Sequence, residues 1–188
     1  MERERSSTKL TYADYAAFPE DGLRHEIIDG EHYVTPSPAT RHQRISRNLL
    51  HLLQTYLDTH PIGEIFGAPF DALLSEFDIV VPDLLYLSRE RARFLTAKNL
   101  QGPPDLVIEI LSPSTRSRDE RLKRDLYERV GVQEYWLADP LREVIHVYRL
   151  DETERFAAPE HYARGDVLTS RLLPELELSV DEVLGPVS

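Results

Sequence analysis

The sequence predicts a mixed α/β fold in which a central mixed sheet is flanked by helices. Two long amphipathic segments with helical spacing are separated by several short apolar strand candidates, and strands and helices do not alternate strictly. The chain has 188 residues, of which 41% are hydrophobic, as is usual for one globular domain. We expect one domain over residues 1–188, with a core at about 10–150 and an acidic extension, 151–188, packed on it.

The N-terminal part is predicted to form a short helix, a hairpin and a long helix. Thr11 and Asp14 would cap a helix over residues 12–18. The Asp29-Gly30 dipeptide separates two short apolar stretches, which is typical of a hairpin turn. Between residues 39 and 58 the apolar residues recur at helical spacing, so we expect a helix there.

The remaining helices and strands are predicted from helical spacing, from capping residues and from short apolar stretches. A second helix is predicted from about residue 114 to 130, where Gly131 ends it. Ser179 and Glu182 would cap a last short helical turn. Strands are expected at residues 64–66, 70–74, 83–87, 105–111, 134–138 and 144–150.

Composition excludes several classes of function. The chain contains no cysteine, which excludes disulfides, thiolate metal sites and cysteine nucleophiles. It contains no apolar run long enough to span a membrane, and its charged start does not resemble a secretory signal, so we expect a cytoplasmic protein with no membrane partner. The formal net charge of −11 argues against tight non-specific DNA binding but leaves room for a local basic groove.

The second predicted helix carries a lysine on its apolar side. With Leu122 at zero and about 100° per residue, Lys123 lies at about 100° and Asp119 at about 60°, within the arc that contains Leu126 and Val130. A lone buried ammonium is unfavourable without an anionic partner. Lys123 therefore either belongs to a site, pairs simply with Asp119 one turn away, or extends to the surface.

Acidic residues interrupt two apolar strands. Glu109 shares a strand face with Val107, and Asp83 opens another strand directly after Pro82. Two carboxylates on adjacent strands suit a hard divalent cation such as Mg²⁺. The alternative is that they are two unrelated acids at strand ends.

Two further polar residues lie in apolar surroundings. His42 falls within the apolar stripe of the first long helix, where a hydrogen-bonded core histidine is the commoner interpretation. Glu26 precedes two isoleucines just before the predicted hairpin turn, which on its own is a weak signal.

An ordered set of motifs gives these residues a common context. It comprises the segment His-Glu-Ile-Ile-Asp-Gly-Glu at 25–31, His42, Pro82-Asp83, the segment Pro-Asp-Leu-Val-Ile-Glu-Ile-Leu-Ser-Pro at 104–113, Lys123, and the segment Gly-Val-Gln-Glu-Tyr-Trp-Leu-Ala-Asp-Pro at 131–140. Over about residues 10–185 this set resembles the Uma-type family, which is named for restriction endonucleases and belongs to the PD-(D/E)XK nuclease superfamily.

The resemblance implies a restriction-endonuclease-like fold and hydrolysis of DNA phosphodiesters by water activated by Mg²⁺ or Mn²⁺. Asp83 and Glu109 would be the metal ligands, and Glu26 the superfamily's auxiliary acid, which would complete the metal shell. The superfamily places a lysine two residues after the second acid, where this sequence has Leu111. A variant moves that lysine to the following helix, so Lys123 is the expected replacement and the fourth catalytic residue.

Other residues and functions stay open. His42, Ile110 through its backbone carbonyl, and Asp119 are auxiliary candidates at the site. A nuclease fold that binds nucleic acid or protein without cleaving it is the main alternative, and hydrolysis of a smaller phosphate ester is a third. A homodimer is also considered, because enzymes that cut both DNA strands are commonly dimers. Five helix arginines are candidates for phosphate contacts or are ordinary solvated charges: Arg41, Arg44, Arg116, Arg118 and Arg124.

Overall fold

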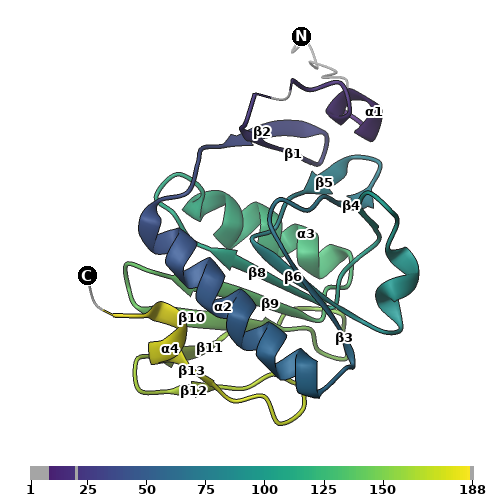
Figure 1. The fold of residues 1–188 in the computed structure, drawn as a ribbon. Coiled ribbons are helices and arrows are strands. Elements are labelled where there is room, and N and C mark those ends of the chain that lie inside the picture. Colours follow the sequence, from purple (N-terminus) through teal and green to yellow (C-terminus); the bar gives the residue numbers. More distant parts are fainter. Residues whose placement is uncertain (1–8, 20, 187–188) are drawn as a thin grey trace.

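The computed structural model describes residues 9–19 and 21–186 of the chain, and its centre is a six-stranded sheet (Figure 1). The strands at Leu106–Ile110 (β8) and Glu134–Asp139 (β9) run parallel and the other neighbours are antiparallel, so the predicted mixed sheet is confirmed. In spatial order its strands are β11 (Glu160–Ala163), β10 (Val144–Arg149), β9 (Glu134–Asp139), β8 (Leu106–Ile110), β6 (Leu84–Ser88) and β3 (Gly63–Gly67).

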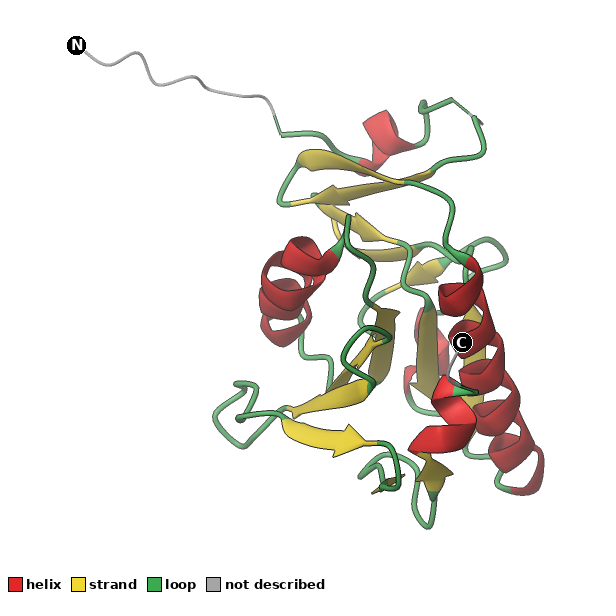
Figure 2. Ribbon diagram, turned by 90° about the vertical axis from the view of Figure 1, so that its left-hand side faces the viewer, coloured by secondary structure: helices red, strands yellow, loops and turns green. Residues whose placement is uncertain are grey.

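Helices cover both faces of this sheet (Figure 2). On one face lies α2 (Thr40–Thr59), whose buried leucines pack against Leu106, Ile108 and Ile110 of β8. On the other face Val107 and Leu111 pack with residues of α3 (Arg124–Arg129). The period-two prediction for this strand is therefore confirmed, and it places Glu109 on the α3 side.

A second, five-stranded sheet lies above the first in Figure 1 and carries the N-terminal hairpin. The hairpin turns at Asp29 and Gly30, whose φ values of 52° and 79° are those of a tight two-residue hairpin turn. The short helix α1 (Tyr12–Tyr15) has the predicted cap, in which the Thr11 N–H donates to Asp14 Oδ2 at 2.8 Å. The sheet consists, in spatial order, of β2 (Glu31–Thr35), β1 (Arg24–Ile28), β5 (Asp78–Val80), β4 (Ala72–Ser75) and β7 (Leu100–Gln101).

The predicted helix at 114–130 differs from expectation in its first half. It begins with a wide π-helical segment, η2 (Arg118–Lys123), and continues as α3. Asp119 and Lys123 are buried as predicted, but Leu122 is 43% exposed, so its placement on the apolar face is wrong. The buried face is centred on Lys123 rather than Leu122, since a π-helical segment does not follow the 3.6-residue period.

The C-terminal residues pack against α2. The strand pair β12 (Val167–Leu168) and β13 (Leu178–Ser179) leads into α4 (Val180–Leu184), whose apolar residues join the α2 core. Asn48 of α2 donates from Nδ2 to the carbonyl of Glu182 at 3.1 Å. The short 3-10 helix η1 (Arg91–Phe94) precedes β7. Within the described residues, no helix is long and apolar enough to cross a membrane.

Candidate active site

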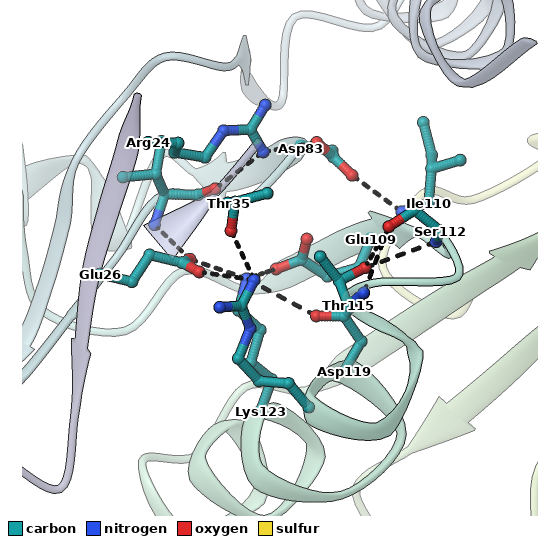
Figure 3. Close-up of polar contacts among 12 residues, drawn as sticks. Arg24, Glu26, Thr35, Asp83, Glu109, Ile110, Ser112, Thr115, Asp119 and Lys123 are labelled. Carbon is teal, nitrogen blue, oxygen red and sulfur yellow. Dashed lines mark hydrogen bonds and ion pairs between the residues drawn. The ribbon is translucent and has the colours of Figure 1, made fainter. Parts of the chain in front are cut away.

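Asp83, Glu109 and Lys123 line one cavity of about 180 Å³, so the prediction that they converge is confirmed. Asp119 lines the same cavity. We call this cavity the carboxylate pocket and define it by Asp83, Glu109, Asp119 and Lys123. Asp83 precedes β6, Glu109 lies on β8, and the other two lie on η2, so elements distant in sequence build the pocket (Figure 3).

Asp83 is held by donors on both of its oxygens. Arg24 Nη1 donates to Oδ1 at 2.8 Å, while the Ile110 N–H donates to Oδ2 at 2.9 Å. His42 Nε2 lies 3.0 Å from the same Oδ2. Burial raises the pKa of Asp83, but the hydrogen bond and charge of His42 and the charge of Arg24 outweigh it and lower the pKa to about 2. Asp83 is therefore a carboxylate at neutral pH.

Lys123 lies between two buried carboxylates. Its Nζ is 2.7 Å from Glu26 Oε1 and 2.8 Å from Glu109 Oε1, whereas Asp119 Oδ1 is 3.8 Å away. Its side chain is 3% exposed. Lys123 does not pair mainly with Asp119, and its ammonium does not reach the surface. The two alternatives to a site at Lys123 are therefore wrong. Burial lowers the pKa of Lys123, but the charges of Glu109 and Glu26 exceed that effect and raise it.

Glu109 shares one of its oxygens between two donors. Lys123 Nζ and the Tyr127 hydroxyl, the latter at 2.9 Å, both donate to Oε1. Burial raises the pKa of Glu109 to about 8, against the attraction of Lys123 and with further repulsion from Asp119. One ammonium thus faces more acidic groups than it can neutralise, so the cluster favours a retained proton.

Glu26 belongs to the same cluster but does not line the cavity. It lies on β1, is fully buried, and accepts from the Val81 N–H at 3.0 Å with the oxygen that also contacts Lys123. Its Oε2 is 3.4 Å from Arg118 Nη2 and has no hydrogen-bond partner. Lys123 therefore connects Glu26, which does not line the cavity, to Glu109, which does.

Two neighbours of the site, Arg24 and Tyr127, were missed by the sequence reasoning, and a third, Arg118, was named only as a candidate for a phosphate contact. Arg24 precedes Glu26 by two residues on β1, so the strand period would have placed both on one face. Tyr127 follows Lys123 by one helical turn, a position that brings its hydroxyl to the same carboxylate. Arg118, one of the five arginines considered for phosphate, lines the cavity and donates to the Thr35 hydroxyl.

The other four arginines do not line the cavity. Arg41 Nη2 donates to Glu143 at 2.6 Å, and Arg116 makes two contacts of 2.9 Å with Asp139. Arg124 pairs with its neighbour Asp125 at 2.8 Å. Arg44 is exposed on α2. Three of the five arginines that were candidates for phosphate contacts are thus paired with acidic side chains of the protein.

The donor chemistry of the pocket fits a divalent cation. Asp83, Glu109 and Asp119 supply hard oxygen donors, and Asp119 Oδ1 is buried without a hydrogen-bond partner. Lys123 and Tyr127 both bind Oε1 of Glu109, so neither of them occupies Oε2. Among the described residues, however, no three acidic or histidine side chains are already gathered as a metal site. A cation at Asp83 would share Oδ1 with Arg24, or Oδ2 with the Ile110 N–H and His42, or would displace one of these groups.

The fold and the pocket together define a protein of the restriction-endonuclease-like class. Residues 12–181 match the Uma2 family, described as "Putative restriction endonuclease", and the chain belongs to this family. The fold is similar to the crystal structure of a "putative nuclease belonging to DUF820 from Anabaena variabilis", with a TM-score of 0.78, 21% identity, and coverage of 93% of this chain and 97% of that chain. No match was found among curated proteins.

Proposed function

We propose that the protein is an endonuclease that hydrolyses DNA phosphodiester bonds with the help of Mg²⁺ or Mn²⁺. Membership of a family described as "Putative restriction endonuclease" supports the reaction class. The observation that carries the proposal is the meeting of Asp83, Glu109 and Lys123 in one pocket. A buried lysine opposed to two acids is a costly arrangement for a fold that needs no chemistry at that point.

In this proposal Asp83 and Glu109 hold the cation. When bound, the cation lowers the pKa of a water molecule and offsets the charge of the phosphate. The Ile110 N–H and His42 fix the orientation of Asp83, which is the role that we assign to His42. The carbonyl of Ile110 and the free oxygen of Asp119 are additional donors at the same cavity.

Lys123 and Arg118 act on the substrate side. The Lys123 ammonium offsets negative charge that develops on the phosphate oxygens in the transition state. Arg118 is the cavity-lining arginine suited to a phosphate contact. Because Glu26 contacts Lys123 and does not line the cavity, we propose that it positions the ammonium instead of completing the metal shell.

A nuclease fold that binds without cleaving is the second candidate, and one observation favours it. Both oxygens of Asp83 already accept hydrogen bonds, so the site is stable without a cation. In that case Arg24 would permanently occupy the place of the metal. The two candidates differ in whether a divalent cation binds at Asp83.

Titration calorimetry with MgCl₂ and MnCl₂ tests the proposal before any substrate is known. We expect the wild-type protein to bind one of the cations, and to nick supercoiled plasmid DNA in its presence but not in EDTA. Absence of cation binding would refute the proposal and leave the binding module. Cation binding without cleavage of plasmid or of oligonucleotides would also refute it. Sedimentation of the same samples tests the predicted homodimer.

A further inference from the structure

A second and larger groove, of about 620 Å³, opens beside the carboxylate pocket. The two cavities share Arg24 and residues 35–38, the link between the hairpin and α2. Arg24 is bound to Asp83 and lines both cavities, so a molecule that entered the groove would lie next to the proposed catalytic residues.

Aromatic rings form a row along this groove. Tyr12, Tyr15 and Phe18 follow one another, with ring centroids 6.2 Å and then 5.8 Å apart. Phe18 continues the row to His25 of the hairpin at 5.3 Å. All four rings line the groove, and Tyr12, at the end of the row, is 38% exposed. Planar, partly exposed rings of this kind are platforms on which nucleobases stack.

The charges that line the groove favour a base over a phosphate, because the positive charge of Arg24 is already paired with Asp83. Asp71 lines the groove and accepts a hydrogen bond from the Tyr15 hydroxyl at 3.0 Å. A carboxylate there repels the sugar-phosphate backbone and can accept from the amino groups of bases. The chain as a whole carries a formal charge of −11, so long-range attraction to a duplex backbone is weak.

We infer that the aromatic groove binds an unpaired nucleobase beside the cleaved phosphate, so that the substrate is single-stranded DNA or a DNA strand with unpaired nucleotides. In a duplex, neighbouring base pairs cover the faces of each base, and stacking on Tyr12 requires that the base leave the helix. The inference rests on the proposed nuclease function for the cleavage step, but its binding step stands on the groove alone.

Fluorescence anisotropy with labelled oligonucleotides of about 12 nucleotides tests this binding step. The full chain, in EDTA, is titrated into a single strand and into the blunt duplex of the same sequence. We expect the single strand to bind at least about tenfold more tightly than the duplex. Tyr12→Leu should weaken single-strand binding about tenfold, whereas Tyr12→Phe, which keeps the ring, should stay close to the wild type. Tyr56→Leu, near the far end of α2, is the matched control and should bind as the wild type does.

Each outcome separates this inference from the proposed function. Equal binding of single strand and duplex, or a Tyr12→Leu variant that binds like the wild type, overturns the inference even if the enzyme cleaves duplex DNA. Tyr12-dependent binding of the single strand without cleavage in Mg²⁺ or Mn²⁺ supports the inference and refutes the nuclease. If Tyr12→Leu changes the sedimentation of the protein and not its DNA binding, a second copy occupies the groove and the inference is wrong.

Discussion

Lys123 Nζ and Glu109 Oε1 lie 2.8 Å apart in a cluster that also contains the carboxyl groups of Glu26 and Asp119. The Lys123 ammonium, with Arg118 at 3.4 Å from Glu26, therefore faces three acids in surroundings that are almost fully buried. Like charges repel strongly where water does not screen them. Burial first, and this repulsion in addition, raise the pKa of Glu109, which makes the cluster sensitive to pH and to substitution.

Glu109→Gln should raise the melting temperature in metal-free buffer and abolish cleavage. Between an unfolded pKa of about 4.5 and a folded pKa of about 8, the folded wild type binds more protons than the unfolded chain, so its stability falls as the pH rises through that range. Glutamine does not titrate and has nearly the same shape. The gain should therefore be several degrees at pH 9 and small at pH 5, at about 2–4 °C per kcal/mol.

Melts followed by the fluorescence of Trp136, the single tryptophan, measure this difference. Mg²⁺ should stabilise the wild type and leave the glutamine variant unchanged. A variant that melts below the wild type at both pH values would show that structural hydrogen bonds hold Glu109, and would remove this support for its role as a ligand.

Lys123→Met should destabilise the fold by about 3–5 kcal/mol, because it leaves buried acids without their cation. The double variant Lys123→Met/Glu26→Gln should recover part of that loss, since one of the stranded charges is gone. Urea denaturation of the wild type, both single variants and the double variant gives the coupling energy. Additive losses would mean that the 2.7 Å contact between the two residues contributes little.

Lys123→Ala should bind the cation and not cleave, provided that its fold is verified first.

Asp83→Asn or Asp83→Ala should abolish binding of Mg²⁺ and Mn²⁺ in calorimetry. The carboxylate is ionised at neutral pH, and asparagine keeps an acceptor for the Ile110 N–H while losing the charge that holds a cation. Asp105→Asn is the control, because Asp105 is about as buried as Asp83 but does not line the cavity. Asp105 Oδ2 accepts a hydrogen bond from the Ser88 N–H at 2.7 Å. Retained cation binding in the Asp83 variants would place any metal elsewhere.

Arg24→Met should tighten cation binding several-fold. Its guanidinium contacts Asp83 Oδ1 at 2.8 Å and competes with a cation for that oxygen. Removing it lets the pKa of Asp83 rise, but the hydrogen bond and charge of His42 still hold it down. Calorimetry at neutral pH reports the change directly. Unchanged or weaker affinity would show that Arg24 does not block the metal position.

The sequence predicted the parts of the fold that have a strong period. The alternation from Leu106 to Ile110 and the apolar stripe of α2 each recur often enough to identify a strand and a helix. The Asp29-Gly30 turn was recognisable because its two positive φ values favour these residue types. The short strands β5, β7, β11, β12 and β13 were missed, since two to four residues are too few to show a period.

The candidate site was predictable where a charged side chain broke an apolar pattern, as with Lys123 and Glu109. Arg24 broke no apolar pattern, because an arginine at the start of a hairpin is an ordinary surface residue by sequence, and only its spacing of two residues from Glu26 linked it to the site. The exposure of Leu122 was not predictable either, since nothing in the sequence marks the π-helical segment that alters the wheel.

Glu143, a partly exposed acid, connects the C-terminal segment to α2 through ion pairs with two arginines. It lies in the turn between β9 and β10, contacts Arg164 at 2.9 Å and Arg41 at 2.6 Å, and these hydrogen bonds, Arg164's first, lower its pKa to about 2. Stability from such a depressed pKa is present above the unfolded value of about 4.5 and is lost as the pH falls towards 2. Glu143→Gln should therefore have a lower melting temperature than the wild type at about pH 7, and this difference in melting temperature should become smaller near pH 2.5. Glu90→Gln, which alters a side chain that is 82% exposed, should show no such difference at either pH. A difference of equal size at both pH values would mean that the packing of Glu143, and not its charge, stabilises the segment.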